Sequence, residues 1–456
     1  VLALLYIMAG FASGTWILHG KEYRVDTLYH AYIGPGTTQT SIKLAGPVNL
    51  RVFYTTTDLK NENVDVRAIK HKDTLTGLGT VSNAAESHST SNRSYFAGIN
   101  ADFFSSSMPC GITVVDGEVY CSDQASGWSL FGIDANKIPY SGGGDFYVKL
   151  TAPDYSTAEL SAMNLERETN GLVLYSSRKG ANTGTDGNGS EVVLIPDGEG
   201  NFLTPGATVR MRVQGNPNHA GSMPIPDNGY ILSGSGTKES FVSNLSEGDE
   251  VEVRCAIRFN GFTGGKIQQA LGGCPMLVSG GKVLDTENAL DHLTSAQPRT
   301  AVGYNAEKNK LVMLVADGRS SISVGPISKV LADIMIYAGC SEAMNFDGGG
   351  SSTFYVKGEG VINQPSDGSE RSVTDGLYLS TDAPQNDMTI TTIRFMDYAK
   401  TLNQGDAYTP VIYGYNQYGV LVDRNVEGVT LSCGSSLGTI TNDGTTLNAS
   451  GSGTHM

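Results

Sequence analysis

Charged residues are scarce in this chain of 456 residues, because Asp, Glu, Lys and Arg together make up 17% of it, below the roughly 25% of an average globular protein. The balance is acidic, with 31 basic against 46 acidic side chains and a formal net charge of −15. No basic run exceeds two residues. Nucleic acids and anionic membranes are bound by positive surfaces. The composition therefore argues against either as a partner.

Cysteine and long hydrophobic runs are also scarce. Six Cys in so long a chain do not make a disulfide scaffold, and no Cys-x-x-Cys zinc pattern occurs. Cys110 and Cys121 flank a glycine-containing segment, where they either bridge or stay free thiols. Residues 1–14 are interpreted as the remnant of a secretion signal, the alternative being a buried first strand. No later stretch approaches the ~18 apolar residues of a membrane span. We therefore expect no membrane span after signal removal.

Helical periodicity is rare. Most segments alternate apolar and polar residues between Gly, Asn, Asp and Pro, which is typical of strands. The clearest helix follows Gly325-Pro326 and ends at Gly339, between apolar runs at 311–316 and 343–346. A strand, a crossover helix and a second strand predict a βαβ unit with parallel, usually neighbouring strands. The predicted fold class is α+β, a strand-rich mixed sheet with a βαβ unit and few helices.

Changes in texture along the chain predict its domain organisation. After the signal remnant at 1–14 we expect a β-rich N-terminal segment at 15–89. The main domain is expected at 90–385, with a β-rich insertion at about 130–270. Short strands between turn signals at 386–456 predict a β-sandwich module, truncated before it is complete.

Two aspartates follow the two apolar runs of the predicted βαβ unit. Asp317 and Asp347 each come one position after a run, and the carboxyl ends of parallel strands meet at one edge of a sheet, where open α/β sheets bind ligands. Asp-Gly is also a common tight turn, so either aspartate alone is readily explained as a turn. The same dipeptide begins at Asp116, Asp186, Asp197, Asp367, Asp375 and Asp443.

Groups suited to an anion surround the second aspartate. Gly348 and Gly349 permit a close backbone approach, and consecutive N–H groups in such a turn form a nest for anions. Ser351 and Ser352 add hydroxyl donors. A guanidinium fork matches phosphate oxygens. Arg319 directly follows the turn at Asp317, and Arg299 and Arg371 lie in short polar breaks next to apolar strands. Carboxylates beside such a group suit a sugar phosphodiester.

An upstream segment has the same form. The apolar run at 95–99 ends in Asn100 and Asp102, with aromatic residues on either side, and is either part of the site or an ordinary strand end. His292 precedes Arg299 and is either catalytic or a surface histidine. No P-loop or His-Glu-x-x-His occurs.

At these residues the sequence resembles the phosphodiester glycosidase family, the domain of the lysosomal uncovering enzyme that also occurs in bacterial exported proteins. The resembling blocks are 98–104, 298–303, 315–319, 345–353 and 363–371. The tail from about residue 388 is similar to bacterial immunoglobulin-like surface modules. The resemblance implies a bacterial protein that is secreted or held at the cell surface or cell wall, with a carbohydrate phosphodiester as its substrate.

The resemblance implies hydrolysis between the anomeric carbon of a sugar and a phosphodiester oxygen. Asp317 or Asp347 would act as base or nucleophile, with Asp102 as partner and the three arginines on the phosphate. We expect no required cofactor. One alternative is cleavage at phosphorus, assisted by Mg²⁺ or Ca²⁺ on the three aspartates. The other is a glycan-binding protein without catalytic activity.

Overall fold

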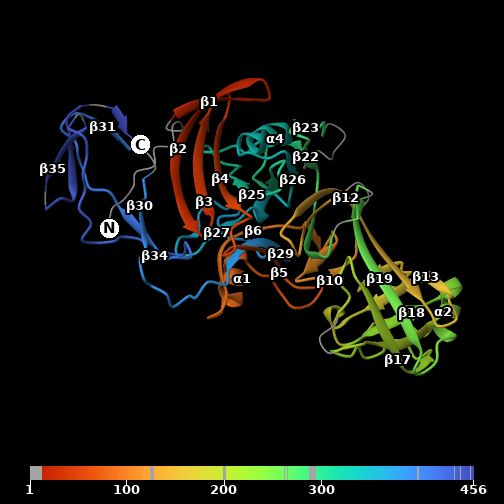
Figure 1. Ribbon diagram of the computed structural model, residues 1–456. Helices are drawn as coiled ribbons and strands as arrows, with labels where there is room; N and C mark the ends of the chain where they lie inside the picture. The colour runs from red at the N-terminus through yellow and green to blue at the C-terminus, as the bar shows by residue number, and fades with distance from the viewer. Residues whose placement is uncertain are drawn as a thin grey trace.

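The computed structural model describes residues 13–123, 128–198, 202–260, 262–263, 265–286, 294–397, 400–435, 437–441, 443–451 and 453–455. The predicted strand-rich character is confirmed, since most elements are strands arranged in three large sheets (Figure 1). The predicted signal remnant lies outside the described residues except for Ser13 and Gly14, and so does His292. None of the described helices combines the length and the apolar character needed to cross a bilayer.

The first sheet has nine strands, and every neighbouring pair in it is antiparallel. One face packs against helix α4 (Ser328–Tyr337). In spatial order the strands are β1 (Ser13–Leu18), β2 (Lys21–Gly34), β3 (Thr37–Ala45), β4 (Asn49–Asp58), β25 (Lys310–Ala316), β24 (Arg299–Tyr304), β26 (Glu342–Asn345), β22 (Met276–Ser279) and β23 (Lys282–Val283).

This order corrects the predicted βαβ unit. Strands β25 and β26, on either side of α4 in the sequence, are not neighbours, because β24 lies between them and pairs antiparallel with both. The two strands therefore run in the same direction without being hydrogen-bonded to each other. A strand with apolar residues on both faces is suited to the centre of a sheet, whether its neighbours are parallel or antiparallel. The apolar pattern of β25 and β26 therefore does not reveal the strand between them.

The second sheet has five antiparallel strands, in the order β28 (Gly360–Val361), β27 (Phe354–Val356), β6 (Ser94–Asn100), β29 (Asp375–Thr381) and β5 (Asp65–Lys70). One face packs on the nine-stranded sheet through a shared apolar core. Helix α1 (Val81–His88) packs against the other. A two-stranded hairpin, β7 (Phe104–Ser105) and β8 (Met108–Pro109), follows β6.

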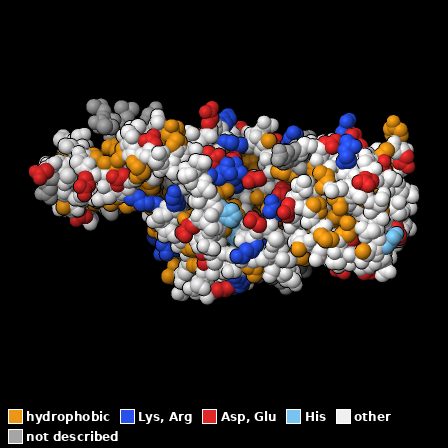
Figure 2. Space-filling view, turned by 90° about the horizontal axis from the view of Figure 1, so that it is seen from below, with side chains coloured by type: hydrophobic (Ala, Val, Ile, Leu, Met, Phe, Trp, Pro, Cys, Tyr) orange, Lys and Arg blue, Asp and Glu red, His pale blue; other side chains and the backbone are white. Residues whose placement is uncertain are grey.

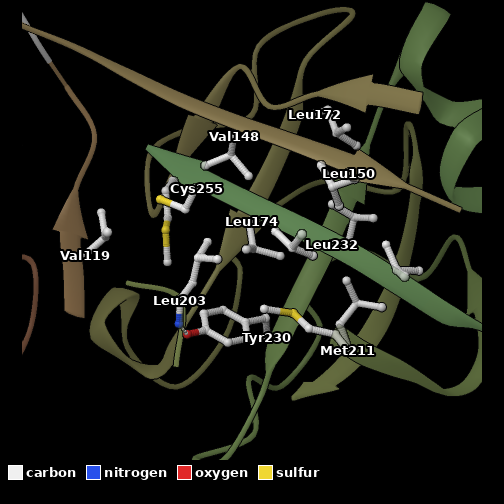
Figure 3. Packing of buried hydrophobic residues seen from close by; sticks show 14 of the residues in the cluster. Val119, Val148, Leu150, Leu172, Leu174, Leu203, Met211, Tyr230, Leu232 and Cys255 are labelled. Carbon is white, nitrogen blue, oxygen red and sulfur yellow. Dashed lines mark hydrogen bonds between the residues drawn. The ribbon is translucent and has the colours of Figure 1, made fainter. Parts of the chain in front are cut away.

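The third sheet has thirteen strands and is mixed, because its one parallel pair joins β14 to β15. Its first and last strands, β10 and β14, are in contact, and Asn164 Nδ2 donates to the carbonyls of Val119 and Tyr120. The sheet thus curls nearly closed around an apolar core (Figure 3). Helix α2 (Glu239–Ser243) and the short helices η1 (Ser177–Lys179) and η2 (Gly236–Lys238) accompany it. The main path is β10 (Glu118–Cys121), β9 (Thr113–Val115), β21 (Ile267–Gly273), β11 (Ser129–Asp134), β12 (Pro139–Thr151), β19 (Glu250–Phe259), β17 (Thr208–Asn218), β16 (Ser190–Pro196), β18 (Tyr230–Gly234), β15 (Leu172–Tyr175) and β14 (Ala162–Met163), with β13 (Thr157–Glu159) on β12 and β20 (Phe262–Thr263) on β19.

The C-terminal strands form three small sheets: β30 (Thr392–Phe395), β33 (Ile412–Tyr415) and β34 (Leu421–Asp423); β31 (Lys400–Leu402) and β37 (Gly453–His455); and β32 (Ala407–Tyr408), β36 (Thr446–Ala449) and β35 (Gly438–Thr441). The immunoglobulin-like assignment stays a prediction. This part lies beside β2 (Figure 1). The Tyr415 hydroxyl donates to the carbonyl of Tyr32 in β2 over 2.8 Å.

Surface charge and thiols complete the description. On the face drawn in Figure 2, basic side chains occur in small groups beside acidic ones, without a continuous basic area. All six cysteines are free thiols, so Cys110 and Cys121 do not form a disulfide.

Candidate active site

The candidate site lies where strand ends from all three large sheets meet. Strand β6 ends at Asn100, and the chain after β26 crosses it, so that the Asp347 N–H donates to the carbonyl of Ala101 over 2.8 Å. The end of β21 reaches the same place, where the Gly272 N–H donates to Asp102 Oδ2 over 3.1 Å. The first two sheets supply most of the polar groups, and the third contributes the backbone of Gly272.

Three arginines lie against the three successive glycines of Gly348–Gly350, and we call this arrangement the glycine cradle. A Cβ atom on the first glycine would lie 3.7 Å from Cδ of Arg299, and one on the second would lie 2.9 Å from a terminal nitrogen of Arg319. On the third glycine it would overlap a terminal nitrogen of Arg371. A side chain on Gly349 or Gly350 would displace a guanidinium group, and one on Gly348 would meet the Pro298 carbonyl at 2.7 Å. The glycines of this segment thus bring three positive groups close to bare backbone.

Two of these guanidinium groups repel each other. Arg299 is 2% exposed, and burial together with the charge of Arg319 lowers its pKa to about 10. Its Nη2 donates to the carbonyl of Ser295, and its buried Nε has no hydrogen-bond partner among the described residues. Arg319 donates to Gln297 Oε1 over 2.7 Å. A bound anion would satisfy the free donor and screen the repulsion, because charge-assisted pairs of this kind are strong.

The third arginine is held in place by a carboxylate. Arg371 forms an ion pair with Asp367 over 2.6 Å, and its Nη1 donates to Ser351 Oγ over 3.3 Å. Ser351 also forms a hydrogen bond with the carboxylate of Asp347. This arginine is therefore oriented before any ligand arrives, which reduces the entropy lost on binding.

Asp347 is the half-buried carboxyl beside the cradle. Burial raises its pKa to about 6, and the charge of Asp375 adds to the rise, while Ser351, Arg371 and the Gly348 N–H oppose it. A carboxyl with this pKa is mostly ionised at neutral pH and still basic enough to take a proton. It is suited to the work of a base or a nucleophile.

Asp317 follows β25 directly and is 3% exposed. Its Oδ1 accepts from the Gln364 N–H over 2.9 Å and from Asn363 Nδ2 over 3.4 Å. Burial raises its pKa to about 6, against these two donors and the charge of Arg51. It holds the loop after β28 in place at the edge of the site.

A buried hydrogen-bond network connects the two aspartates. Asn363 bonds both Asp317 and the Ser352 carbonyl. Thr300 donates to Asn100 Oδ1 over 2.8 Å and lies 3.2 Å from Ser352 Oγ, and Asn100 Nδ2 donates to the Asp347 carbonyl over 2.7 Å. Asn100 and Ser352 are 0% and 1% exposed. These two predicted binding residues thus lie in the interior beneath the site, and Ser351 is equally buried at 0% exposed.

The sequence interpretation missed two buried residues. Asp375 begins β29, fully buried and paired in register with Lys70 at the end of β5. Its Oδ1 accepts from the backbone N–H of Asp102 over 2.9 Å. Asp375 is followed by Gly376 and was assigned to an ordinary turn, and Lys70 follows an alternating strand pattern typical of an exposed lysine. Only the pairing of β5, β29 and β6 brings them together.

The burial of Asp317 predicts a pH-dependent stability. Because its folded pKa is about 6, against an ordinary value of 3.8, the folded state binds more protons between these values, and stability falls as the pH rises through this window. Asp317→Asn removes the effect, and the amide oxygen can still accept from Gln364. We expect the difference in unfolding free energy, variant minus wild type, to grow by about 3 kcal/mol from below pH 4 to above pH 6.

Urea unfolding at several pH values measures this difference. Asp443→Asn, at an Asp-Gly turn in the C-terminal part, is the matched control. A difference that stays constant across the range would show that the folded pKa of Asp317 is not raised.

Comparison with known proteins identifies the segment that contains the cradle. Residues 205–380 match the phosphodiester glycosidase family. The match contains Arg299, Asp317, Asp347 and Arg371, whereas Asp102 precedes it. At the level of the family, the phosphodiester glycosidase match indicates a glycosidase-type hydrolase.

Other proteins resemble parts of the chain. The SPbeta prophage-derived uncharacterized protein YomE of Bacillus subtilis (strain 168) is 40% identical over 88 residues, which are 19% of this chain and 13% of the length of that relative. A hypothetical protein from Synechocystis has a similar fold, with a TM-score of 0.58 at 15% identity over 76% of this chain and 62% of its own. A putative exported protein from Burkholderia pseudomallei has a TM-score of 0.55 at 22% identity, over 74% of this chain and 75% of its own.

Proposed function

We propose that this chain hydrolyses the bond between the anomeric carbon of a sugar and an oxygen of a phosphodiester. Water adds to the carbon, the carbon–oxygen bond breaks, and the oxygen leaves with the phosphorus, so that free sugar and a phosphomonoester result. The observation that supports this most is the glycine cradle, which places three guanidinium groups beside a carboxyl of raised pKa. The family match at residues 205–380 supports the same class of reaction.

The cradle would bind the phosphate. Two guanidinium groups without a carboxylate partner among the described residues, Arg299 and Arg319, face the same glycines as the preoriented Arg371. The phosphate is the leaving group, and because a phosphodiester is already acidic, it needs little protonation. Stabilising the charge that develops on it is then the main task, and preorganised donors do this best in a site that excludes water.

The aspartates would act on the sugar. Glycoside cleavage uses a carboxylate that stabilises the oxocarbenium-like carbon, attacks it, or activates water. We assign this role to Asp347, since it is half-buried and adjoins the cradle, whereas Asp317 is bound by backbone and side-chain donors at the edge. Asp102 lies behind Asp347 as its buried partner.

Hydrolysis in ¹⁸O-labelled water tests this function. A panel of sugar-1-phosphodiesters is incubated with the protein, free sugar is measured, and the products are analysed by mass spectrometry. We expect the label in the sugar, because water adds to carbon. Label in the phosphate would instead show attack at phosphorus, and binding of the panel without any turnover would show a glycan-binding protein.

Metal dependence is tested in the same assay. No group of three or more His, Cys, Asp or Glu side chains arranged to hold a metal ion occurs in the described part of the chain. We propose that the reaction requires no metal ion, so turnover after dialysis against a chelator should match that of untreated protein. Loss of turnover that added Mg²⁺ or Ca²⁺ restores would contradict this.

We also propose that the protein works outside a bacterial cell, at the surface or in the medium. A protein of similar fold is described as exported. Fractionation of the producing organism, followed by the free-sugar assay on each fraction, tests the location.

A further inference from the structure

A lysine is buried behind the candidate site. Lys70 is 2% exposed, and its Nζ donates to the carbonyl of Thr374 over 3.2 Å. A buried ammonium is costly unless an opposite charge accompanies it. Burial lowers the pKa of Lys70, and the carboxyls of Asp375 and Asp102 oppose the fall. The lysine is therefore electrostatically coupled to these two aspartates, and its printed hydrogen bond goes to the Thr374 carbonyl rather than to either carboxylate.

Asp375 is the member of the group whose surroundings favour the carboxylate form. Its Oδ1 accepts from the Asp102 N–H over 2.9 Å and its Oδ2 from the Thr374 hydroxyl over 3.0 Å. It also faces Lys70 across the β5–β29 pair. Hydrogen bonds and a positive charge both stabilise the ionised form. Burial raises the pKa of Asp375, and these three groups lower it.

Asp102 has surroundings that favour the protonated form. Its Oδ2 accepts from the Gly272 N–H, but its buried Oδ1 has no hydrogen-bond partner among the described residues. Burial and then the charge of Asp375 raise the pKa of Asp102 well above its usual range. A proton on Asp102 avoids two adjacent buried negative charges. The titratable groups that face it are Lys70, Cys110, Cys121, Asp347 and Asp375.

We propose that Lys70, Asp375 and Asp102 form a buried unit that holds a positive charge, a negative charge and one proton respectively, and that this unit sets the ionisation of Asp347. The charge of Asp375 reaches Asp347 and favours its protonated form. The N–H of Asp347 is bonded to Ala101, next to Asp102. Lys70 and Asp375 are thus positioning residues. The role in catalysis rests on the proposed function, whereas the proton on Asp102 does not.

Opposite changes of charge test the unit. The acidic limb of the pH profile of kcat/KM reports the ionisation of Asp347 in the free enzyme. Asp375→Asn is made together with Asp102→Asn, because Asp102 alone could ionise in place of Asp375. This Asp102→Asn/Asp375→Asn variant removes a negative charge and should move the limb down by roughly one pH unit relative to Asp102→Asn, and Lys70→Met removes a positive charge and should move it up by a similar amount. Asp102→Asn replaces a neutral acid by a neutral amide, so it should leave the limb in place, whatever rate it retains.

A merely structural role would lower the rate without moving the limb. Limbs that stay in place or move in the same direction in Asp102→Asn/Asp375→Asn and Lys70→Met would overturn the proposal. A downward movement in Asp102→Asn alone would also overturn it, because it would show a charged Asp102. The variant Lys70→Met/Asp375→Asn removes both charges and replaces the other variants if one of them does not fold. The acidic limb of its pH profile should lie near that of the wild type. A clear displacement of this limb would overturn the proposal.

A measurement without substrate separates this inference from the proposed function. In protein with ¹³C-labelled aspartate carboxyls, we expect one protonated carboxyl signal to persist at neutral pH and to disappear in Asp102→Asn. Its absence from the wild type would refute the protonated Asp102 even in an active enzyme. Its presence in a protein that turns over no sugar phosphodiester would support the proton assignment and refute only the proposed function.

Discussion

Asp347→Asn is expected to lower kcat/KM for a sugar phosphodiester by roughly 10³-fold, within the range observed when a positioned acid or base is lost. The carboxylate is the half-buried group beside the glycine cradle, and burial raises its pKa to about 6. The amide has nearly the same shape and can still accept a hydrogen bond. The loss should therefore appear in kcat, with KM little changed. Steady-state release of free sugar measures both.

Asp443→Asn is the control, since that residue lies at an Asp-Gly turn in the C-terminal part. Thermal unfolding should show that Asp347→Asn is as well folded as the control. Turnover at the wild-type rate in the Asp347 variant would remove this residue from the mechanism. Turnover lost in Asp317→Asn instead would transfer the role to Asp317.

Gly350→Ala is expected to lower kcat/KM by roughly 10²-fold, because a displacement of about 1 Å in a positioned group has an effect of this size. The added methyl group would overlap the side chains of Arg371 and Asp367, the ion pair that orients this part of the cradle. Gly451→Ala is the matched control, since a Cβ there meets no atom within 4 Å. A rise in KM with the fold retained is the expected pattern.

A double-variant cycle tests whether the glycine acts through the arginine. If its function is to leave room for Arg371, the combination Gly350→Ala/Arg371→Ala should be no worse than Arg371→Ala alone. Losses that multiply would show that the two residues act independently, contrary to the geometry of the cradle.

The sequence allowed the strand-rich architecture and the positions of the main polar groups to be predicted, because both depend on local patterns. Asp317 follows β25 directly, as expected, and Asp347 comes two positions after β26. The order of strands was not predictable in the same way. Strand β24 precedes β25 in the chain but inserts between β25 and β26, and nothing in an apolar run specifies its partners.

Burial of individual polar residues was also beyond local patterns. Asn100 and Ser352 lie in strand-end sequences that suggested contact with substrate, yet both are interior members of a hydrogen-bond network. Asp375 resembled the other Asp-Gly turns until β29 placed it beside β5 and β6. Whether a polar side chain faces solvent or another sheet depends on pairings between distant segments.

The meeting of strand ends from three sheets has a consequence for folding. The bonds that assemble the site join residues far apart in the chain, with separations of 170 residues for Gly272 to Asp102, 247 for Asn100 to Asp347 and 273 for Asp102 to Asp375. Contacts of such long range form slowly, since the entropy of closing a large loop is lost before they stabilise anything. During refolding from denaturant, recovery of catalytic competence should therefore lag behind the return of β-sheet circular dichroism.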